Sequence, residues 1–174
     1  SVSPSKIESD VEITPEFSNV LKSIDDGKSF IFITGMAGSG KSTLIDLIKN
    51  RLKLSHLLVA PTGIAALNIG GSTIHSVFRV PFGPCPETKI IDGMGGIILR
   101  NLELLIIDEI SMVRADVLDA ISNSLQIHKK NNRPFGGIQI AVFGDLFQLP
   151  PVVNDDDKQI LFSKYTSEYF FSAN

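Results

Sequence analysis

The chain has 174 residues, of which 43% are hydrophobic. This is enough for one α/β domain with a substantial core, and it is short for two domains. Its formal net charge of −3 argues against nucleic-acid binding through a broad basic surface, so any such contact is expected to be local. Because Cys85 is the single cysteine, no internal disulfide can form, and without a secretory signal or an apolar run of membrane-spanning length we expect an intracellular protein with no membrane partner.

The beginning of the chain is expected to be a polar segment, 1–14, followed by one domain, 15–174. Pro15 is expected to open a helix that ends near Gly27. The apolar residues that share one face of this helix are Phe17, Val20, Leu21 and Ile24.

Short, continuously apolar runs alternate with helical stretches along the rest of the chain. Such runs are typical of parallel strands that helices cover on both faces, so the predicted class is α/β. The expected strands are Ser29–Thr34, His56–Ala60, Leu104–Asp108 and Ile138–Gly144.

A glycine-rich loop lies between an apolar strand and a helix in the run Ile31–Thr43. Its pattern Gly-x-x-x-x-Gly-Lys-Ser, from Gly35 to Ser42, turns the backbone so that successive N–H groups converge on phosphate oxygens. The following helix, expected to run to Leu54, aims the positive end of its dipole at the same anion. Lys41 is predicted to reach the β and γ phosphates of a nucleotide, and the Ser42 hydroxyl to face Mg²⁺. The predicted nucleotide-binding residues are Gly35, Ala37, Gly38, Ser39, Gly40, Lys41, Ser42 and Thr43. The alternative is a glycine-rich turn that binds no ligand.

The stretch from Val80 to Gly96 is rich in proline and glycine, which predicts an ordered excursion or a mobile loop. Cys85 lies within it and is interpreted as a spare thiol.

Two adjacent carboxylates end the apolar strand that begins at Leu104. In a phosphate-loop protein the first acid, Asp108, is predicted to order the magnesium shell, and the second, Glu109, to act as the base that polarises the attacking water. The alternative is an acidic pair that caps a following helix at Ser111.

The segment Gly144–Pro151 places Gln148 just beyond the carboxyl end of another strand, where ligands bind in open parallel sheets. The amide of Gln148 can hydrogen-bond a γ-phosphate oxygen or the attacking water. An equally good interpretation is a loop glutamine that caps exposed backbone.

These motifs have the order and the residue sequences that are typical of the Pif (petite integration frequency) family of RecD-like superfamily I DNA helicases. The chain resembles this family from about Pro15 onward. Only Gly144–Pro151 is common to wider relatives. The further stretches that carry the resemblance are Ala60–Gly71, Thr73–Phe78, Ile107–Asp116, Arg133–Gly137 and Tyr169–Asn174. The resemblance implies an α/β RecA-like P-loop NTPase domain with a mainly parallel central sheet and helices on both faces.

The resemblance also implies an ATP-driven, Mg²⁺-dependent motor that moves 5′ to 3′ on single-stranded DNA and has its nucleotide between two RecA-like domains. This chain would hold only the first domain, catalysis resting on Lys41, Glu109 and Gln148. The second domain, with the arginine that completes the ATP site, is expected beyond Asn174. The cell compartment would be the bacterial cytoplasm, or the nucleus or mitochondrion of a eukaryote.

For DNA contact the resemblance points to Thr62, Gly63, His75, Ser76 and Phe78. Thr62 and the Gly63 amide would hold a backbone phosphate, and His75 and Ser76 would add hydrogen bonds. Phe78 would stack on a base, although its neighbourhood favours a place in the core. His75 has the alternative of a satisfied internal histidine.

Two other features of this sequence bear on the comparison with the family. Its usual glutamine, which reads adenine ahead of the phosphate loop, is replaced by Ser18, and a shorter hydroxyl predicts weak base selectivity. Arg79, Arg114 and Arg133 are interpreted as equally suited to surface ion pairs and receive no role.

Two other classes of function stay open at this point. One is a different phosphate-loop enzyme, either a small-molecule kinase with an arginine-bearing lid or a ring-forming ATPase. The other is a module that binds magnesium nucleotide through Lys41, Asp108 and Glu109 without turning it over.

Overall fold

The computed structural model describes residues 13–34, 39–51, 53–81, 83, 93–145, 151, 157, 161–162, 164–167 and 169–173. Four predicted site residues, Gly35, Ala37, Gly38 and Gln148, lie outside this part of the chain, and so does Cys85. Within it, no helix is long and apolar enough to cross a membrane.

The centre of the molecule is a parallel sheet in the strand order β1-β5-β4-β2-β3. The strands are β1 Phe30–Ile33, β2 His56–Ala60, β3 Ser72–Thr73, β4 Leu104–Ile107 and β5 Gln139–Phe143. The α-helices are α1 Pro15–Asp25, α2 Ser39–Arg51, α3 Gly63–Asn68, α4 Ile74–Phe78, α5 Gly93–Asn101 and α6 Ala115–Lys129. Short 3-10 helices are η1 Ile110–Met112, η2 Pro134–Gly137 and η3 Phe170–Ser172.

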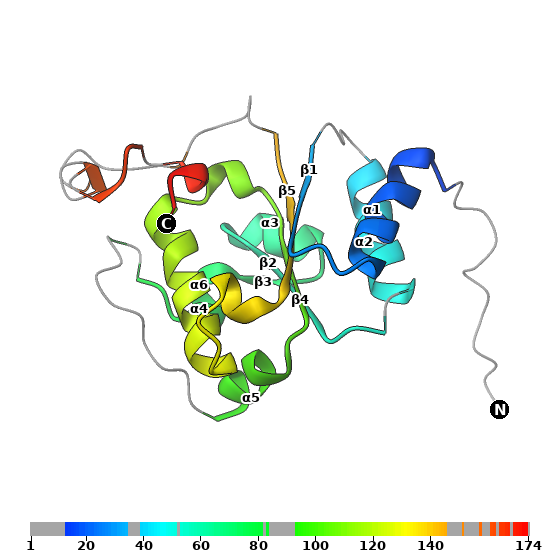
Figure 1. Cartoon of the computed structure of the whole chain (residues 1–174). Helices are drawn as coiled ribbons and strands as arrows, with labels where there is room; N and C mark the ends of the chain where they lie inside the picture. The colour runs from blue at the N-terminus through cyan, green and yellow to red at the C-terminus, as the bar shows by residue number, and fades with distance from the viewer. Residues whose placement is uncertain are drawn as a thin grey trace.

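Helices cover both faces of this sheet (Figure 1). The helices α1 and α2 pack on one face, and α4, α5 and α6 pack on the other. Strand β4 is apolar throughout because its side chains enter the cores on both faces of the sheet. Leu104 and Ile106 belong to the core under α2, whereas Leu105 and Ile107 belong to the core under α6. All four side chains are fully buried, as expected for a strand with helices on both faces. The predicted α/β class is therefore confirmed.

The predicted strands and first two helices agree with the structure apart from their ends, but the predicted loop Val80–Gly96 is wrong at its end, because α5 begins at Gly93. The first helix begins at Pro15, where the Thr14 hydroxyl accepts a hydrogen bond from the Phe17 amide at 3.3 Å, and Gly27 lies just beyond its end in a left-handed conformation. The second helix ends at Arg51 rather than at Leu54. Strand β3 was not predicted, because two residues are too few to show an alternating or continuous apolar pattern.

The described residues after position 160 pack against α6 (Figure 1). The Tyr165 hydroxyl donates to Asp119 Oδ2 at 2.7 Å, and Tyr169 forms an antiparallel bridge with Arg114. The ring of Phe170 stacks on Phe32 with centroids 6.2 Å apart. This segment therefore closes the face of the sheet that α6 covers.

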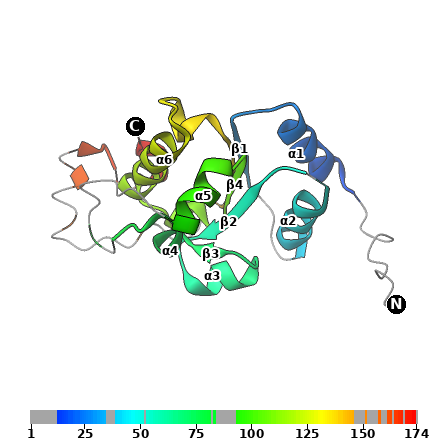
Figure 2. The same cartoon turned by 90° about the horizontal axis from the view of Figure 1, so that it is seen from below.

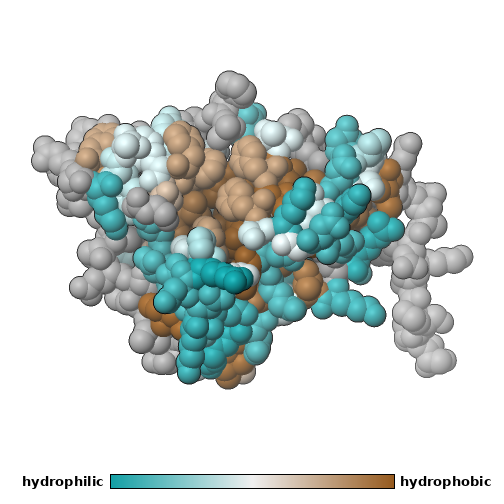
Figure 3. Space-filling view, in the orientation of Figure 1, coloured by the Kyte–Doolittle hydropathy of each residue, from teal (hydrophilic) through white to brown (hydrophobic). Residues whose placement is uncertain are grey.

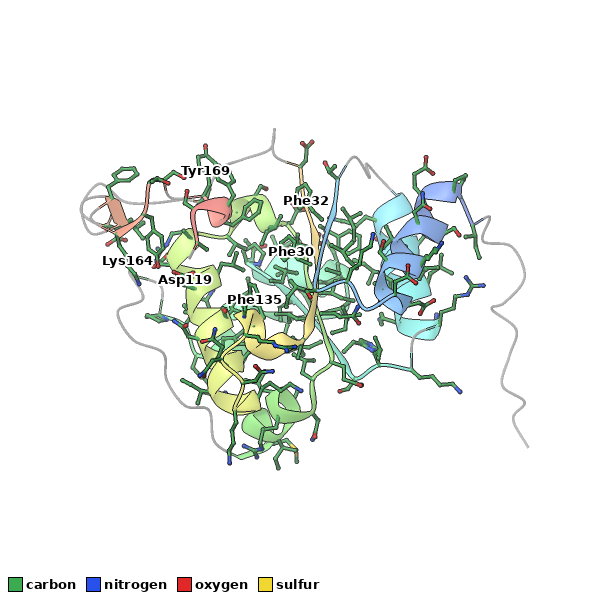
Figure 4. All side chains as sticks on the ribbon, in the orientation of Figure 1. Phe30, Phe32, Asp119, Phe135, Lys164 and Tyr169 are labelled. Atoms are coloured by element: carbon green, nitrogen blue, oxygen red, sulfur yellow. The ribbon has the colours of Figure 1, made fainter. Side chains whose placement is uncertain are left out.

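Strand β1 lies at one edge of the sheet formed by the described residues. On the side facing α6, Phe30, Phe32 and Phe135 lie close to one another, and Phe30 is 46% exposed (Figure 4). Figure 3 shows apolar surface on this side of the molecule, where a hollow of about 270 Å³ lies between Phe30 and Phe171.

Candidate nucleotide site and nucleic-acid interface

Several of the predicted functional residues in the described part of the chain lie at the carboxyl edge of the sheet. Strand β1 leads toward the predicted phosphate loop, β4 ends directly before Asp108, and β2 ends directly before Pro61. Because the strands are parallel, their carboxyl ends share one edge, and this is where ligands bind in open α/β sheets.

Lys41 joins the first motif to the second. It lies in the first turn of α2, and its Nζ is 3.0 Å from Asp108 Oδ1 and 2.9 Å from Glu109 Oε1. Burial lowers the pKa of Lys41, but the hydrogen bonds and charges of Glu109 and Asp108 outweigh it and raise the pKa above its usual value. Lys41 is therefore a fully charged ammonium in contact with both carboxylates.

Asp108 is the buried member of this group, with 2% of its surface exposed. Burial raises the pKa of its carboxyl above the usual value, and the hydrogen bond and charge of Lys41 oppose this shift. The chain thus holds an acid in a place where its charge is costly unless cations lie beside it. Such a position is typical of a functional carboxylate rather than of a solvated turn.

Glu109 adopts a left-handed backbone with φ 51° and ψ 46°, which is unusual for a residue with a side chain. Its amide donates to Asp108 Oδ1 at 2.9 Å, and its carboxylate turns to Lys41. The side chain makes no cap to the following helix η1, so the alternative of an acidic pair that caps at Ser111 finds no support. Strained backbone of this kind costs about 1–3 kcal/mol and is concentrated at functional sites.

Gly144 was not singled out as a position of close contact in the third motif. A Cβ on this residue would lie 2.7 Å from Ile110 Cγ2, so only glycine lets the end of β5 approach the residue after Glu109. The signal in the sequence was the glycine directly after an apolar strand. The segment Gly144–Pro151, which holds Gln148, therefore begins next to the residue that follows Asp108 and Glu109.

The predicted magnesium ligands fit the preferences of that ion. Ser42 is exposed near the start of α2, and Asp108 offers a carboxylate at the same edge of the sheet. Mg²⁺ usually keeps several waters and takes one or two protein ligands together with phosphate oxygens. Among the described residues no group of three or more His, Cys, Asp or Glu side chains forms a separate metal cage.

The predicted DNA contacts divide into two groups in space. Thr62 and His75 line one cavity of about 210 Å³, and Gly63 lies exposed beside it at the start of α3. Ser76 instead lines another hollow of about 200 Å³, and its hydroxyl donates to the Thr73 carbonyl at 2.9 Å. Figure 2 shows α3 and α4, which carry these residues, beside β3 at the edge of the sheet away from β1.

Phe78 is buried in the core on the α6 side of the sheet, with 2% of its surface exposed. The preference for core over base stacking is confirmed, and its place among the DNA-contact residues was wrong. A ring without an exposed face cannot stack on a base. The reason is its position at the end of α4, whose apolar side packs against the sheet.

His75 is half-buried on the same helix. Burial, together with the positive charge of Arg114, lowers the pKa of its imidazole below the usual value. His75 is therefore a neutral ring near pH 7, suited to hydrogen bonding rather than to charge attraction.

Arg114 was interpreted as a residue suited to a surface ion pair, and the structure shows a buried one. Its Nε and Nη2 lie 2.9 and 2.7 Å from the two carboxylate oxygens of Asp116, and Nη2 also donates to the Gly83 carbonyl at 2.8 Å. Arg114 is 9% exposed and Asp116 4%. The spacing Arg-x-Asp at the start of a helix was the available signal, but it does not report burial.

Fold and site together define the chain as a RecA-like phosphate-loop nucleotide-binding domain. A family model for PIF1-like helicases matches residues 9–171, and the chain belongs to this family. The ATP-dependent DNA helicase RRM3 of Saccharomyces cerevisiae is 37% identical, over 92% of this chain and 24% of that protein. The human ATP-dependent DNA helicase PIF1 is 38% identical, over 81% of this chain and 23% of that protein.

Solved structures agree with this assignment. The Bacteroides Pif1 in complex with ADP-AlF4 is 44% identical, with a TM-score of 0.86 over 94% of this chain and 39% of that chain. The Bacteroides Pif1 bound to single-stranded DNA is 42% identical, with a TM-score of 0.85 and the same coverage. The chain thus spans about a quarter of the curated relatives and about two fifths of these solved chains.

Proposed function

We propose that this chain is the ATP-binding and ATP-hydrolysing motor domain of a helicase that moves 5′ to 3′ on single-stranded DNA. It would be the first of two RecA-like domains, formed by residues 15–174 after the polar segment 1–14. The observation that carries the proposal is the contact of Lys41 with both Asp108 and Glu109, because it joins a phosphate-binding lysine to an acidic pair at one edge of the sheet.

Each residue has one task in this proposal. Lys41 binds the β and γ phosphates, Glu109 accepts a proton from the water that attacks the γ phosphorus, and Gln148 orients that water. ADP leaves as the bond between the γ phosphorus and the bridging oxygen breaks. Ser42 and Asp108 would hold Mg²⁺, which neutralises phosphate charge when bound.

The other functions considered have less support. A nucleotide-binding module without turnover would keep Lys41 and Asp108 but has no need of the strained backbone at Glu109. A kinase or a ring-forming ATPase would share the phosphate loop, but the relatives found carry the name DNA helicase. A DNA motor works where DNA is, so we place the protein in bacterial cytoplasm or in a eukaryotic nucleus or mitochondrion.

Calorimetric titration with Mg²⁺ and a nonhydrolysable ATP analogue tests the nucleotide site. Lys41→Ala is expected to weaken binding by at least about a hundredfold, because charge-assisted hydrogen bonds to phosphate are lost. The matched control is Lys49→Ala on the same helix, whose Nζ lies 3.8 Å from Asp46 Oδ1 in a surface pair. Wild-type affinity in Lys41→Ala would refute the assignment of the phosphate loop.

A further inference from the structure

Helix α5 presents an apolar stripe to solvent. Met94 is 73% exposed, and Ile97 and Ile98 are each nearly half-exposed. Because residues three and four positions apart lie on one face of a helix, these three side chains are neighbours. Isolated apolar residues are ordinary at a protein surface, whereas a contiguous group of them marks a place of contact with a partner.

A hollow of about 200 Å³ lies beside this stripe, between α5 and the end of α4. Ile98 and Gly95 line it from α5, and its other apolar lining residues are Leu57, Val77 and Leu99. Leu99 belongs to the core under α6, and the side chains of Leu57 and Val77 pack against that core. An apolar cavity of about 150 Å³ accommodates benzene, so this hollow has room for one side chain the size of leucine or phenylalanine.

Positive charges flank the apolar stripe on both sides. Arg79 lines the hollow beside Ile98, and among the described residues no carboxylate pairs with its exposed guanidinium. Arg100 follows Ile97 by three positions and so lies next to it, on the side of α5 away from the hollow. The Lys129 ammonium adds a third charge there, because its Nζ donates to the Arg100 carbonyl at 2.8 Å.

The charge of this surface differs from that of the whole chain. The formal net charge of the chain is −3, yet neither α4 nor α5 contains an acidic residue. Glu103 offsets part of the charge of Lys129, whereas Arg79 and Arg100 are the charged groups nearest the stripe. Electrostatic complementarity therefore favours an acidic partner.

This surface is separate from the candidate nucleotide site. Helix α5 ends at Asn101, just before β4 begins at Leu104, so it lies toward the amino ends of the strands. Figure 1 shows α5 at the opposite end of the sheet from the carboxyl ends of β1 and β5, and Figure 3 shows hydrophilic and apolar surface side by side there. A partner bound to α5 would leave the nucleotide site open.

We propose that the stripe of Met94, Ile97 and Ile98, together with the hollow beside it, docks an acidic amphipathic helix of a partner protein. One large apolar side chain of that helix fills the hollow, and its neighbours on the same face lie on the stripe. Carboxylates at the edges of that face pair with Arg79 and Arg100. The phosphates of a nucleic acid would match these two cations but would leave the stripe and the hollow exposed to water, so a protein partner fits better. The proposal does not depend on the proposed ATPase or DNA-binding function.

Fluorescence anisotropy with a labelled helical peptide of about fifteen residues tests this in the 174-residue chain. The peptide has leucines at positions i, i+3, i+4 and i+7 and glutamates beside them, and a hydrocarbon staple on its far face holds the helix. It is expected to bind with a dissociation constant below about 100 μM at low salt, as a small interface would. A matched peptide with glutamine in place of each glutamate is expected to bind at least about fivefold more weakly. Absence of binding by the acidic peptide, or equal binding by both peptides, overturns the proposal.

Two substitutions of exposed isoleucines locate the peptide on the chain. Ile98→Glu places a carboxylate at the hollow and is expected to weaken binding of the acidic peptide by at least about tenfold. The matched control is Ile64→Glu on α3, because Ile64 is 77% exposed and lies outside this surface. It is expected to keep the wild-type affinity. Unchanged affinity in Ile98→Glu, or an equal loss in Ile64→Glu, would show that the peptide binds elsewhere and would refute the docking surface.

Circular dichroism checks that the variants fold. If Ile98→Glu does not fold, Arg79→Gln at the exposed rim decides, because it is expected to reduce the preference for the acidic over the glutamine peptide, and an unchanged preference counts against the proposal. Competition with a single-stranded DNA of about twelve nucleotides separates the two classes of partner. The DNA is expected to leave the peptide bound. Displacement of the peptide by an equal concentration of DNA would assign this surface to nucleic acid and overturn the protein partner.

Discussion

At the centre of the site, Lys41 forms ion pairs with the carboxylates of both Asp108 and Glu109. Strands β2 and β3 and helices α3, α4 and α5 lie between Lys41 and Asp108 in the chain, yet the charged atoms of the two residues lie 3.0 Å apart. The sequence predicted each of them from its own motif. It could not supply the distance, because that depends on the pairing of β1, β5 and β4 in one parallel sheet.

Ser18 is exposed on α1, the helix that precedes the phosphate loop in the chain. Because its short hydroxyl takes the place of the glutamine expected from the family pattern, we predict weak selectivity for the base of the nucleotide. Titration of the chain with Mg²⁺-ATP and Mg²⁺-GTP analogues is expected to give similar dissociation constants. A strong preference for ATP would show that other residues read adenine.

His75 predicts a pH dependence of folding stability. Its folded-state pKa is below the usual 6.5, so in the window between the two values the unfolded chain binds more protons than the folded chain. The stabilising contribution is present above pH 6.5 and is lost as the pH falls through and below that value. Thermal unfolding of the wild type should therefore lose more stability than that of His75→Gln between about pH 7.5 and about pH 5.5. Parallel losses in the two proteins would contradict the shift.

At the scale of elements, the turn between α6 and β5 requires backbone conformations and close contacts that few residues allow. Phe135, Gly136 and Gly137 all have positive φ, and the Phe135 amide donates to the Ser122 hydroxyl at 3.0 Å. A Cβ on Gly136 would lie 2.7 Å from the Leu125 carbonyl oxygen of α6. The run Pro-Phe-Gly-Gly therefore holds the helix against the start of β5 through close backbone contact.

We predict that Gly136→Ala lowers the free energy of unfolding by about 3 kcal/mol or more, through strained φ and a clash with helix backbone. Gly27→Ala is the matched comparison, because Gly27 has φ +73° and nothing within 4 Å of an added Cβ. It should lose only about 1–2 kcal/mol, from the left-handed backbone alone. Urea unfolding measures both. Equal losses would mean that the contact with Leu125 yields easily.

At the scale of the molecule, the chain is a RecA-like domain, a parallel sheet with helices on both faces. Its candidate nucleotide site lies at the carboxyl edge of this sheet. The relatives of known sequence are about four times as long as the part matched here. In the proposed enzyme an arginine from a second domain completes the site. Loss of such an arginine typically lowers phosphoryl-transfer rates by about three to five orders of magnitude.

We therefore predict that this chain binds Mg²⁺-ATP but turns it over negligibly, with or without single-stranded DNA. Phosphate release at low salt measures the rate, and a longer chain that includes the second domain provides the reference. Strong DNA-stimulated turnover by the 174-residue chain would mean that a second copy or another residue completes the site. In that case, Glu109→Gln should abolish the turnover if Glu109 is the base.

The sequence by itself determined the α/β class and most strand and helix positions, and it predicted roles for Lys41, Asp108 and Glu109. Local patterns suffice for these, because apolar runs, a glycine loop and adjacent carboxylates act within a few neighbouring residues. Tertiary structure alone decided that Phe78 is buried, that Arg114 is paired inside, and that Thr62 and His75 share a cavity. Burial and convergence of this kind depend on strand order and on how helices pack across the sheet, which no local spacing encodes.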